Sequence, residues 1–216
     1  MLGTRMNHGY GSLPYIGSLL LGYIIGSIPT AYLLVRWTSR VDIRKVGSGN
    51  VGAMNTFDVT RSKWLGIGVF LIDMLKGAAA VLFAKVFLGN DFWALAASGI
   101  GAVIGHNYPV WLRFKGGRGL STAVGVMLSL WWIIVPIWCI VWSIQNAISK
   151  NVHTANIIAT IATAAVLLIA PADWLSATLP QEFRVQDAIL FSCTVFVLIL
   201  LRHVEHIRQL FTSIKQ

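Results

Sequence analysis

Long apolar runs separated by short polar loops constrain this chain more than any other feature. The runs cover about residues 13–35, 64–88, 92–110, 120–149, 155–170 and 188–201. A helix of about 20 apolar residues spans the hydrocarbon core of a bilayer. Only 12% of the 216 residues are charged, whereas about a quarter of the residues in a soluble domain are charged. The pattern predicts an all-α, polytopic membrane protein that forms a single integral membrane domain over residues 1–216.

The positions of lysine and arginine predict which loops face the cytoplasm. Basic residues crowd the first and third loops, at Arg36, Arg40, Arg44, Lys45, Arg61, Lys63, Arg113, Lys115 and Arg118. The second loop carries no basic residue and has Asp91 instead. Cytoplasmic loops carry an excess of Lys and Arg. We therefore expect the first and third loops inside, and their charge accounts for much of the net charge of +9.

Prolines interrupt two of the apolar runs. Pro29 lies within the first run and predicts a kink. The stretch from Leu120 to Ser149, interrupted at Pro136, could form one long helix or two short ones. A single crossing would put the acidic loop 171–187 inside and the basic C-terminal tail outside, against the positive-inside rule. Two short or partly re-entrant helices fit every loop, so we predict about seven transmembrane helices, with the N-terminus out and the C-terminus in.

The first loop contains the segment GSGNVGAMN at residues 47–55. Its glycines allow the backbone to turn and to expose N–H groups, and Ser48, Asn50 and Asn55 add short polar side chains. Such a segment suits an anion-binding nest. Considered without the other loops, the segment could instead be an ordinary flexible turn that binds no anion.

The third loop supplies a second glycine-rich segment. His106 and Asn107 are followed by KGGRG at residues 115–119, which opens into an apolar run. A helix N-terminus with two cations beside it is suited to phosphate. The glycine spacing differs from that of a P-loop, so we do not expect a nucleotide.

Polar residues also occur at the end of the last apolar run and inside the second. His203 and His206 are three residues apart in the tail segment RHVEH and can share a helix face. No cysteine or carboxylate cluster completes a metal site there, so we expect phosphate binding or interfacial packing and no metal. Asp73 and Lys76 have the same spacing among apolar residues, where an ion pair that supports helix packing is favoured over a functional cavity.

Together these segments resemble the bacterial acyl-phosphate:glycerol-3-phosphate acyltransferase family (PlsY). Residues 47–55 are similar to the first family motif except at Met54, and the region from His106 to Gly119 is similar to the second, with Arg118 in place of Lys. The resemblance covers about residues 22–210. Two further positions depart from the family pattern near the phosphate sites. Asp58 stands where the family usually has Arg, and the closing motif has His206 in place of Asn and Gln209 in place of Arg.

The resemblance implies transfer of a fatty acyl group from an acyl-phosphate to the sn-1 hydroxyl of glycerol 3-phosphate, which gives lysophosphatidic acid and phosphate for phospholipid synthesis. It implies no metal, coenzyme A or other cofactor and no nucleic acid partner. It also implies a multi-pass protein of the bacterial inner membrane, expected as a monomer, with its active-site loops in the cytoplasm. The alternatives are a divergent homologue with another phosphorylated acceptor, or a non-catalytic protein that binds or transports a lipid phosphate.

Candidate site residues follow from the matched motifs. Ser48, Asn50, Lys115 and His203 are the expected catalytic residues. The expected substrate-binding residues are Gly47, Gly49, Gly52, Asn55, Arg61, His106, Asn107, Gly116, Gly117, Arg118, Gly119, Glu205 and His206. The first loop is expected to hold the acyl-phosphate, and the third loop with the tail to hold glycerol 3-phosphate. For the base, we leave open His106 and a phosphate oxygen of a substrate, with a structural role for His106 favoured.

Overall fold

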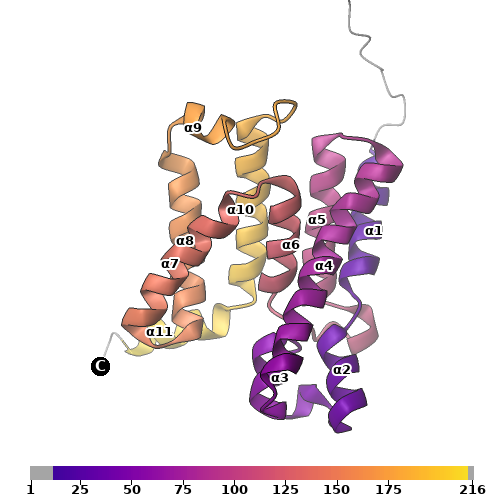
Figure 1. Ribbon diagram of the computed structural model, residues 1–216, viewed down its shortest axis with the longest axis vertical. Coiled ribbons are helices and arrows are strands. Elements are labelled where there is room, and N and C mark those ends of the chain that lie inside the picture. Colours follow the sequence, from indigo (N-terminus) through magenta and orange to yellow (C-terminus); the bar gives the residue numbers. More distant parts are fainter. Residues whose placement is uncertain (1–11, 214–216) are drawn as a thin grey trace, which may run out of the picture.

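The computed structural model describes residues 12–213, with side chains as far as Arg208. This part of the chain is helical and contains no strand (Figure 1). The long helices are α1 (Leu13–Gly26), α2 (Thr30–Ser39), α4 (Lys63–Leu88), α5 (Phe92–Asn107), α6 (Leu120–Leu130), α7 (Ile134–Ser149), α8 (Val152–Ile169), α10 (Val185–Leu201) and α11 (Val204–Ser213). The shorter ones are α3 (Ala53–Thr60), α9 (Ala172–Ser176) and the 3₁₀ turns η1 (Ile43–Lys45) and η2 (Val110–Leu112). Gln209 lies outside the residues whose side chains are described.

Pro29 was predicted to kink one helix, but the helix is broken there, because α1 ends at Gly26 and α2 begins at Thr30. A broken helix leaves backbone carbonyl groups without their usual partners. One of them, the carbonyl oxygen of Ile28, accepts a hydrogen bond of 2.9 Å from Nζ of Lys76 on α4. The buried lysine therefore stabilises the break inside the helix bundle, which is the packing role expected of it.

The stretch from Leu120 to Ser149 forms two helices, α6 and α7, as favoured from the charge pattern. The position of the break was predicted wrongly. The chain turns at residues 131–133, and Pro136 lies in the first turn of α7, where the missing N–H of proline costs no helical hydrogen bond. The turn is anchored by the indole of Trp131, which is 1% exposed and donates a 2.8 Å hydrogen bond to Oγ1 of Thr178 beyond α9.

Glycines allow α1 and α5 to pack closely. An added Cβ at Gly22 or Gly26 would overlap the backbone of α5 at Ser98 or Ala102. The reverse holds at Gly101, where an added Cβ would overlap the backbone of α1. Small residues of this kind let membrane helices approach until their backbones touch. This contact, together with the core formed by α4, α5, α6 and α10, holds the end of α5 where it enters the functional site.

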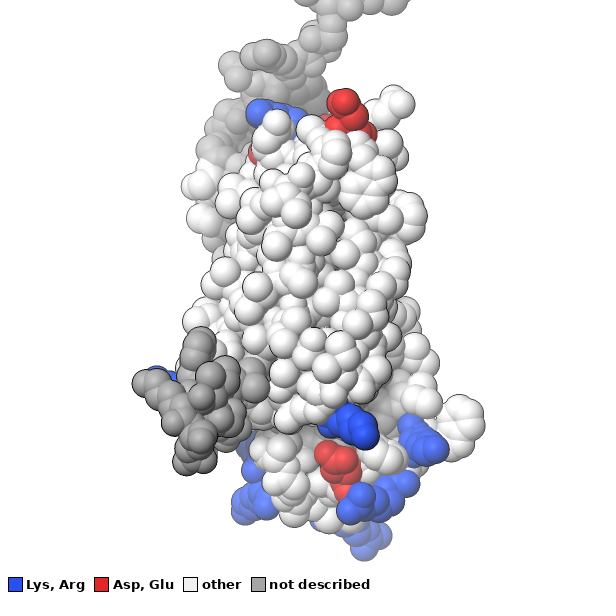
Figure 2. Space-filling model, turned by 90° about the vertical axis from the view of Figure 1, so that its left-hand side faces the viewer, with Lys and Arg blue, Asp and Glu red and all other residues white. Residues whose placement is uncertain are grey.

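The surface has the charge distribution of a membrane protein. Figure 2 shows an uncharged belt between two charged ends, and one of these ends is mostly basic. In the described residues, α4, α8 and the α1–α2 segment are long and apolar enough to cross a bilayer, while α6, α7 and α10 are shorter apolar helices. Cys139 on α7 is exposed. It forms part of the wall of the cavity described below.

Candidate active site

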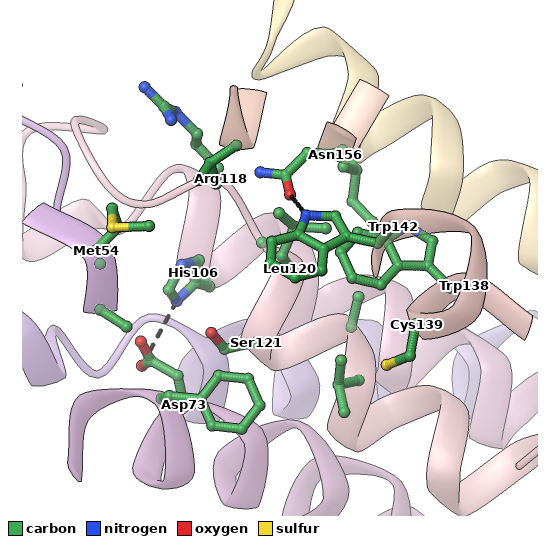
Figure 3. Close-up of a pocket in the computed structure, with 18 of the residues that line it drawn as sticks. Met54, Asp73, His106, Arg118, Leu120, Ser121, Trp138, Cys139, Trp142 and Asn156 are labelled. Carbon is green, nitrogen blue, oxygen red and sulfur yellow. Dashed lines mark hydrogen bonds and ion pairs between the residues drawn. The ribbon is translucent and has the colours of Figure 1, made fainter. Parts of the chain in front are cut away.

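One cavity of about 650 Å³ lies where the glycine-rich loops meet the helix bundle (Figure 3). One part of its wall is polar, formed by Asn50, Lys63, Asp73, His106, Arg118, Ser121, His153 and Asn156. Much of the rest is apolar and comes from α4, α6 and α7, including Phe70, Val124, Met127, Ile134, Val135 and Trp138. A single ligand with an anionic head and an apolar tail matches this division of the wall.

The first loop takes its shape from Asn55, which is 1% exposed. Its Oδ1 accepts a 2.9 Å hydrogen bond from the backbone N–H of Ser48, and its Nδ2 contacts the carbonyl oxygens of Ile43, Val46 and Asn50 at 2.9–3.2 Å. The backbone is left-handed at Gly47 (φ +59°), a conformation that glycine adopts without strain. Asn55 was expected to contact substrate, but its amide is fully engaged with the backbone of its own loop. It therefore positions the loop.

Two helices point their N-terminal ends at the cavity. The wall includes Gly52 and Ala53 at the beginning of α3, and Gly119 and Leu120 at the beginning of α6. The first N–H groups of a helix have no partner within the helix and carry part of the positive end of its dipole. Each glycine-rich segment thus leads into a helix whose N-terminus lines the same cavity.

The third loop folds back on the end of α5. The backbone N–H groups of Gly116 and Gly117 donate to the carbonyl oxygens of Asn107 and His106 at 3.2 and 3.0 Å. A Cβ at Gly117 would overlap Nε2 of His106, so no larger residue fits in this conformation. These two N–H groups were expected to face phosphate, but they bond to α5. His106 thus lies against Gly117 of the loop and also lines the cavity.

Arg202, one residue beyond α10, and Asn107 at the end of α5 connect the third loop to the helix bundle. Arg202 donates to the carbonyl oxygens of Gly117 at 3.0 Å and Gly116 at 3.2 Å, and its guanidinium lies over the ring of Tyr108. Asn107 is fully buried, and its Nδ2 lies 3.4 Å from the carbonyl oxygen of Leu198 on α10. Sequence reasoning assigned Arg202 only to the charge pattern of the tail, and the structure adds this bracing role.

Arg118 lies at the centre of a group of histidines. One of its terminal nitrogens is 2.8 Å from Nδ1 of His153, and the other is 3.4 Å from Nε2 of His206. The rings of His153 and His206 meet edge to face, with centroids 3.9 Å apart. Burial and the positive charge of Arg118 lower the pKa of His206. A neutral imidazole can accept a hydrogen bond from the guanidinium, so His206 helps to orient the cation.

His203 is fully buried between α10 and α11. Burial lowers its pKa to about 4, with further lowering by Arg118 and His206 and an opposing effect of its bond to the Ile199 carbonyl. That bond joins Nδ1 to the oxygen at 2.9 Å, so Nδ1 carries the proton. Nε2 of His203 has no hydrogen-bond partner within the described part of the chain. The residue lies beside His206 and outside the cavity wall.

Asp73 brings a carboxylate to the polar wall. It is 1% exposed, and its Oδ1 lies 2.7 Å from Nζ of Lys76 and 3.6 Å from Nδ1 of His106. The spacing of Gly66, Phe70 and Asp73 puts all three on one face of α4, and this face forms part of the cavity wall. The ion pair predicted between Asp73 and Lys76 is present, and it borders the cavity as well as supporting the bundle.

Trp138 and Trp142 of α7 form an aromatic part of the cavity wall, and both bond to α8. The rings of Trp138 and Trp142 stack with centroids 6.2 Å apart. Nε1 of Trp142 donates to Oδ1 of Asn156 at 2.8 Å, and Nε1 of Trp138 donates to Oγ1 of Thr160 at 3.1 Å. Figure 3 shows that the Asn156 amide nitrogen consequently points away from Trp142, on the side of Arg118. The indole therefore fixes which end of the amide is a donor to the cavity.

The predicted site residues divide into two groups. Those in the cavity wall are Asn50, Gly52, His106, Arg118 and Gly119. Ser48, Arg61, Lys115 and Glu205 are exposed outside this wall, and so is Asp58, whose negative charge was a reason to doubt phosphate binding. Sequence reasoning missed His153 and Asn156. Their signal was available, because polar residues within an apolar helix usually face a functional or packed interior.

Fold and site together define a helical membrane protein with a cavity whose polar part contains Lys63 and Arg118 and whose other part is an apolar groove. The family model for glycerol-3-phosphate acyltransferase matches residues 16–213. The chain belongs to this glycerol-3-phosphate acyltransferase family.

Individual relatives and a solved structure agree with this assignment. A glycerol-3-phosphate acyltransferase of Mesorhizobium japonicum is 37% identical over 194 residues, which are 89% of this chain and 90% of the relative. One of Rhodopseudomonas palustris (strain BisB5) is 46% identical over 128 residues, 59% of this chain but only 64% of that relative. The crystal structure of PlsY (YgiH), an integral membrane glycerol 3-phosphate acyltransferase in its glycerol 3-phosphate form, superposes with a TM-score of 0.77, 33% identity and 92% coverage of both chains.

Proposed function

We propose that this protein transfers a fatty acyl group from an acyl-phosphate to the sn-1 hydroxyl of glycerol 3-phosphate, giving lysophosphatidic acid and phosphate. The observation that carries the proposal is the single cavity that joins two helix N-termini and Arg118 to an apolar groove. An acyl-phosphate has an anionic head and an apolar chain, and lysophosphatidic acid has the same division. The names of the relatives support glycerol 3-phosphate as the acceptor.

The reaction needs positioning and charge stabilisation more than a strong nucleophile, because an acyl-phosphate is already an activated donor. Helix N-termini stabilise the negative charge that develops on the phosphate as the anhydride bond breaks. Holding both substrates in one cavity replaces a bimolecular encounter with an oriented one. Asn50 and Gly52 are suited to the donor phosphate, and Arg118 and Asn156 to the acceptor phosphate. Ser48 and Lys115, which are exposed outside the cavity wall, are proposed to attract both anions to the site.

We further propose seven membrane segments, with the N-terminus outside, the C-terminus inside and the glycine-rich loops in the cytoplasm of a bacterial inner membrane. The basic end seen in Figure 2 supports this orientation, because cytoplasmic loops are enriched in Lys and Arg. We also propose that the protein acts as a monomer.

A different phosphorylated acceptor is the second candidate. The observation that favours it is His206, which stands where the family pattern has Asn and which contacts Arg118 at 3.4 Å. An imidazole is larger than an amide and has a different set of donors and acceptors. An altered acceptor pocket would follow from this substitution alone, with the donor side unchanged.

The test is to incubate the purified protein with palmitoyl phosphate and glycerol 3-phosphate in lipid mesophase, and to measure phosphate and lysophosphatidic acid. Wild type should form both in equal amounts, while Arg118→Gln should form little of either. Parallel reactions with other phosphorylated alcohols distinguish an altered acceptor from lost activity. If no acceptor produces acyl transfer above the level without protein, the enzyme proposal is wrong and binding without catalysis takes its place.

A further inference from the structure

The apolar groove runs along one face of α6. Leu120, Val124 and Met127 line the cavity and are three or four residues apart, so they lie on the same side of the helix. Leu120 is two residues after Arg118, in the polar part of the wall, and Met127 lies two turns further on, about 10 Å along the helix axis. The groove therefore has a polar end at the beginning of α6 and an apolar end near Met127.

Helix α7 lines the groove in the opposite direction. Figure 1 shows that α6 and α7 run away from the turn at residues 131–133 in opposite directions. Trp142 of α7 lies at the polar end, where it bonds to Asn156. Ile134, the first residue of α7, lines the cavity next to the turn. Ile134 and Met127 thus both belong to the apolar end.

The side chains at the apolar end are buried, whereas other parts of the wall are open to the surface. Met127 and Ile134 are each 2% exposed, and Phe196 of α10, which also lines the cavity, is 4% exposed. By contrast, Phe70 on α4 is 37% exposed, and Cys139 on α7 is exposed as well. A chain can therefore approach from the exposed side, but its far end meets buried side chains.

The turn between α6 and α7 holds this end in place. Trp131 is 1% exposed and donates a 2.8 Å hydrogen bond to Oγ1 of Thr178. Its neighbours Leu130 and Ile134 belong to the main hydrophobic core. Protein interiors are packed so closely that a change of one methylene group is felt. The apolar end is thus fixed in position, as a residue that measures chain length must be.

We infer that Met127 and Ile134 set the upper length of the acyl chain that is transferred, an inference that rests on the proposed acyltransferase function. With the anionic head of the acyl-phosphate at the polar end, the chain lies along α6 and its methyl end reaches these two side chains. A longer chain has to bend or displace buried groups, and such overpacking is unfavourable. A shorter chain leaves the end unfilled and forfeits dispersion contacts.

The test compares acyl phosphates of different length on the same preparation of protein in lipid mesophase. Values of kcat/KM are measured for decanoyl, palmitoyl and stearoyl phosphate with glycerol 3-phosphate as acceptor. One methylene group in an apolar pocket changes kcat/KM by about 10- to 200-fold. Met127→Ala should therefore raise the ratio of stearoyl to palmitoyl phosphate at least about tenfold, and Met127→Trp should lower the ratio of palmitoyl to decanoyl phosphate by a similar factor. Each ratio compares two substrates, so a smaller amount of folded protein cancels.

A milder variant and a matched control complete the experiment. Ile134→Val removes one methyl group and should fold even where Met127→Ala does not, and it should shift the stearoyl to palmitoyl ratio in the same direction. Leu128→Ala changes the adjacent residue of α6, which is 46% exposed, and should leave both ratios within about twofold of wild type. The inference is overturned if the folded Met127 and Ile134 variants keep both wild-type ratios, because the chain end would then lie in the bilayer. A wild type that transfers no acyl chain of any length would instead contradict the proposed function.

Discussion

The guanidinium of Arg202, one residue beyond α10, donates a 3.0 Å hydrogen bond to the backbone carbonyl of Gly117 in the third loop. A second bond of 3.2 Å goes to the carbonyl of Gly116. The last long helix thus holds a loop that lies 85 residues earlier in the chain. This loop ends at the N-terminus of α6, so its position determines where the cavity can bind an anion.

Removing this brace should weaken acceptor use. Hydrogen bonds from a charged donor contribute about 1.5–3 kcal/mol, so Arg202→Met should lower kcat/KM for glycerol 3-phosphate by about 10- to 100-fold. Initial rates of phosphate release measure this effect. Arg184→Met, just before α10 at the opposite end of the helix, is the matched control. Equal losses in the two variants would mean that a general loss of positive charge is responsible.

The contact between Gly117 and His106 predicts that substitutions at these two positions have non-additive effects on Tm. Gly117→Ala should lower both activity and Tm, because the new Cβ overlaps the imidazole. Adding His106→Ala removes the obstacle, so the double variant should unfold at a higher temperature than additivity of the single variants predicts. Gly68→Ala on α4, where an added Cβ meets nothing within 4 Å, serves as the control. Strict additivity of the Tm changes would contradict the observed packing.

Asn55 should matter for stability as well as for rate. Its four contacts with the loop backbone contribute about 0.5–1.5 kcal/mol each, so Asn55→Ala should destabilise the protein by about 2–6 kcal/mol. Thermal unfolding in detergent, together with phosphate release, measures both effects. Asn90→Ala, whose exposed side chain contacts Glu182, should change Tm little. A stable but inactive Asn55→Ala protein would point instead to direct substrate contact.

The lowered pKa of His203 predicts that the protein loses stability in acid. Its pKa is lowered to about 4 in the folded protein, mainly by burial, whereas an unfolded histidine titrates near 6.5. As the pH falls through 6.5, the unfolded state gains a proton that the folded state does not bind. Stability therefore decreases between about pH 6.5 and 4, by at most about 3 kcal/mol. Tm measured at pH 7.5 and 5.0 should fall less for His203→Gln than for wild type, and an equal fall in both would exclude this source.

A substitution that fills the apolar groove should weaken use of the acyl donor and leave use of the acceptor unchanged. Val124 on α6 lines the cavity, so Val124→Trp should fill the groove and lower kcat/KM for palmitoyl phosphate at least about tenfold, the effect of roughly 1.4 kcal/mol. The KM for glycerol 3-phosphate should stay within about twofold. Ile144→Trp, on an exposed part of α7, is the matched control. Unchanged use of palmitoyl phosphate would place the acyl chain elsewhere.

Much of this protein follows from local patterns in the sequence. Apolar runs predicted the helices, with the second run expected at residues 64–88 and found as α4 (Lys63–Leu88). The charge pattern favoured two helices between Leu120 and Ser149, and two are present. The KGGRG motif predicted a helix N-terminus after Gly119, and α6 begins at Leu120. These features are local and additive, because each depends on hydropathy, charge or turn chemistry within a few residues.

The tertiary structure alone decided which residues meet. Arg118 contacts His206, 88 residues away, and nothing in the local pattern of either segment predicts this pair. The same holds for Asn55 and Gly117, whose motif positions suggested substrate contact but whose surroundings occupy the Asn55 amide and the Gly117 N–H. The physical reason is that hydropathy specifies which side chains leave water, whereas the packing of helices against one another specifies which polar groups share the space that remains.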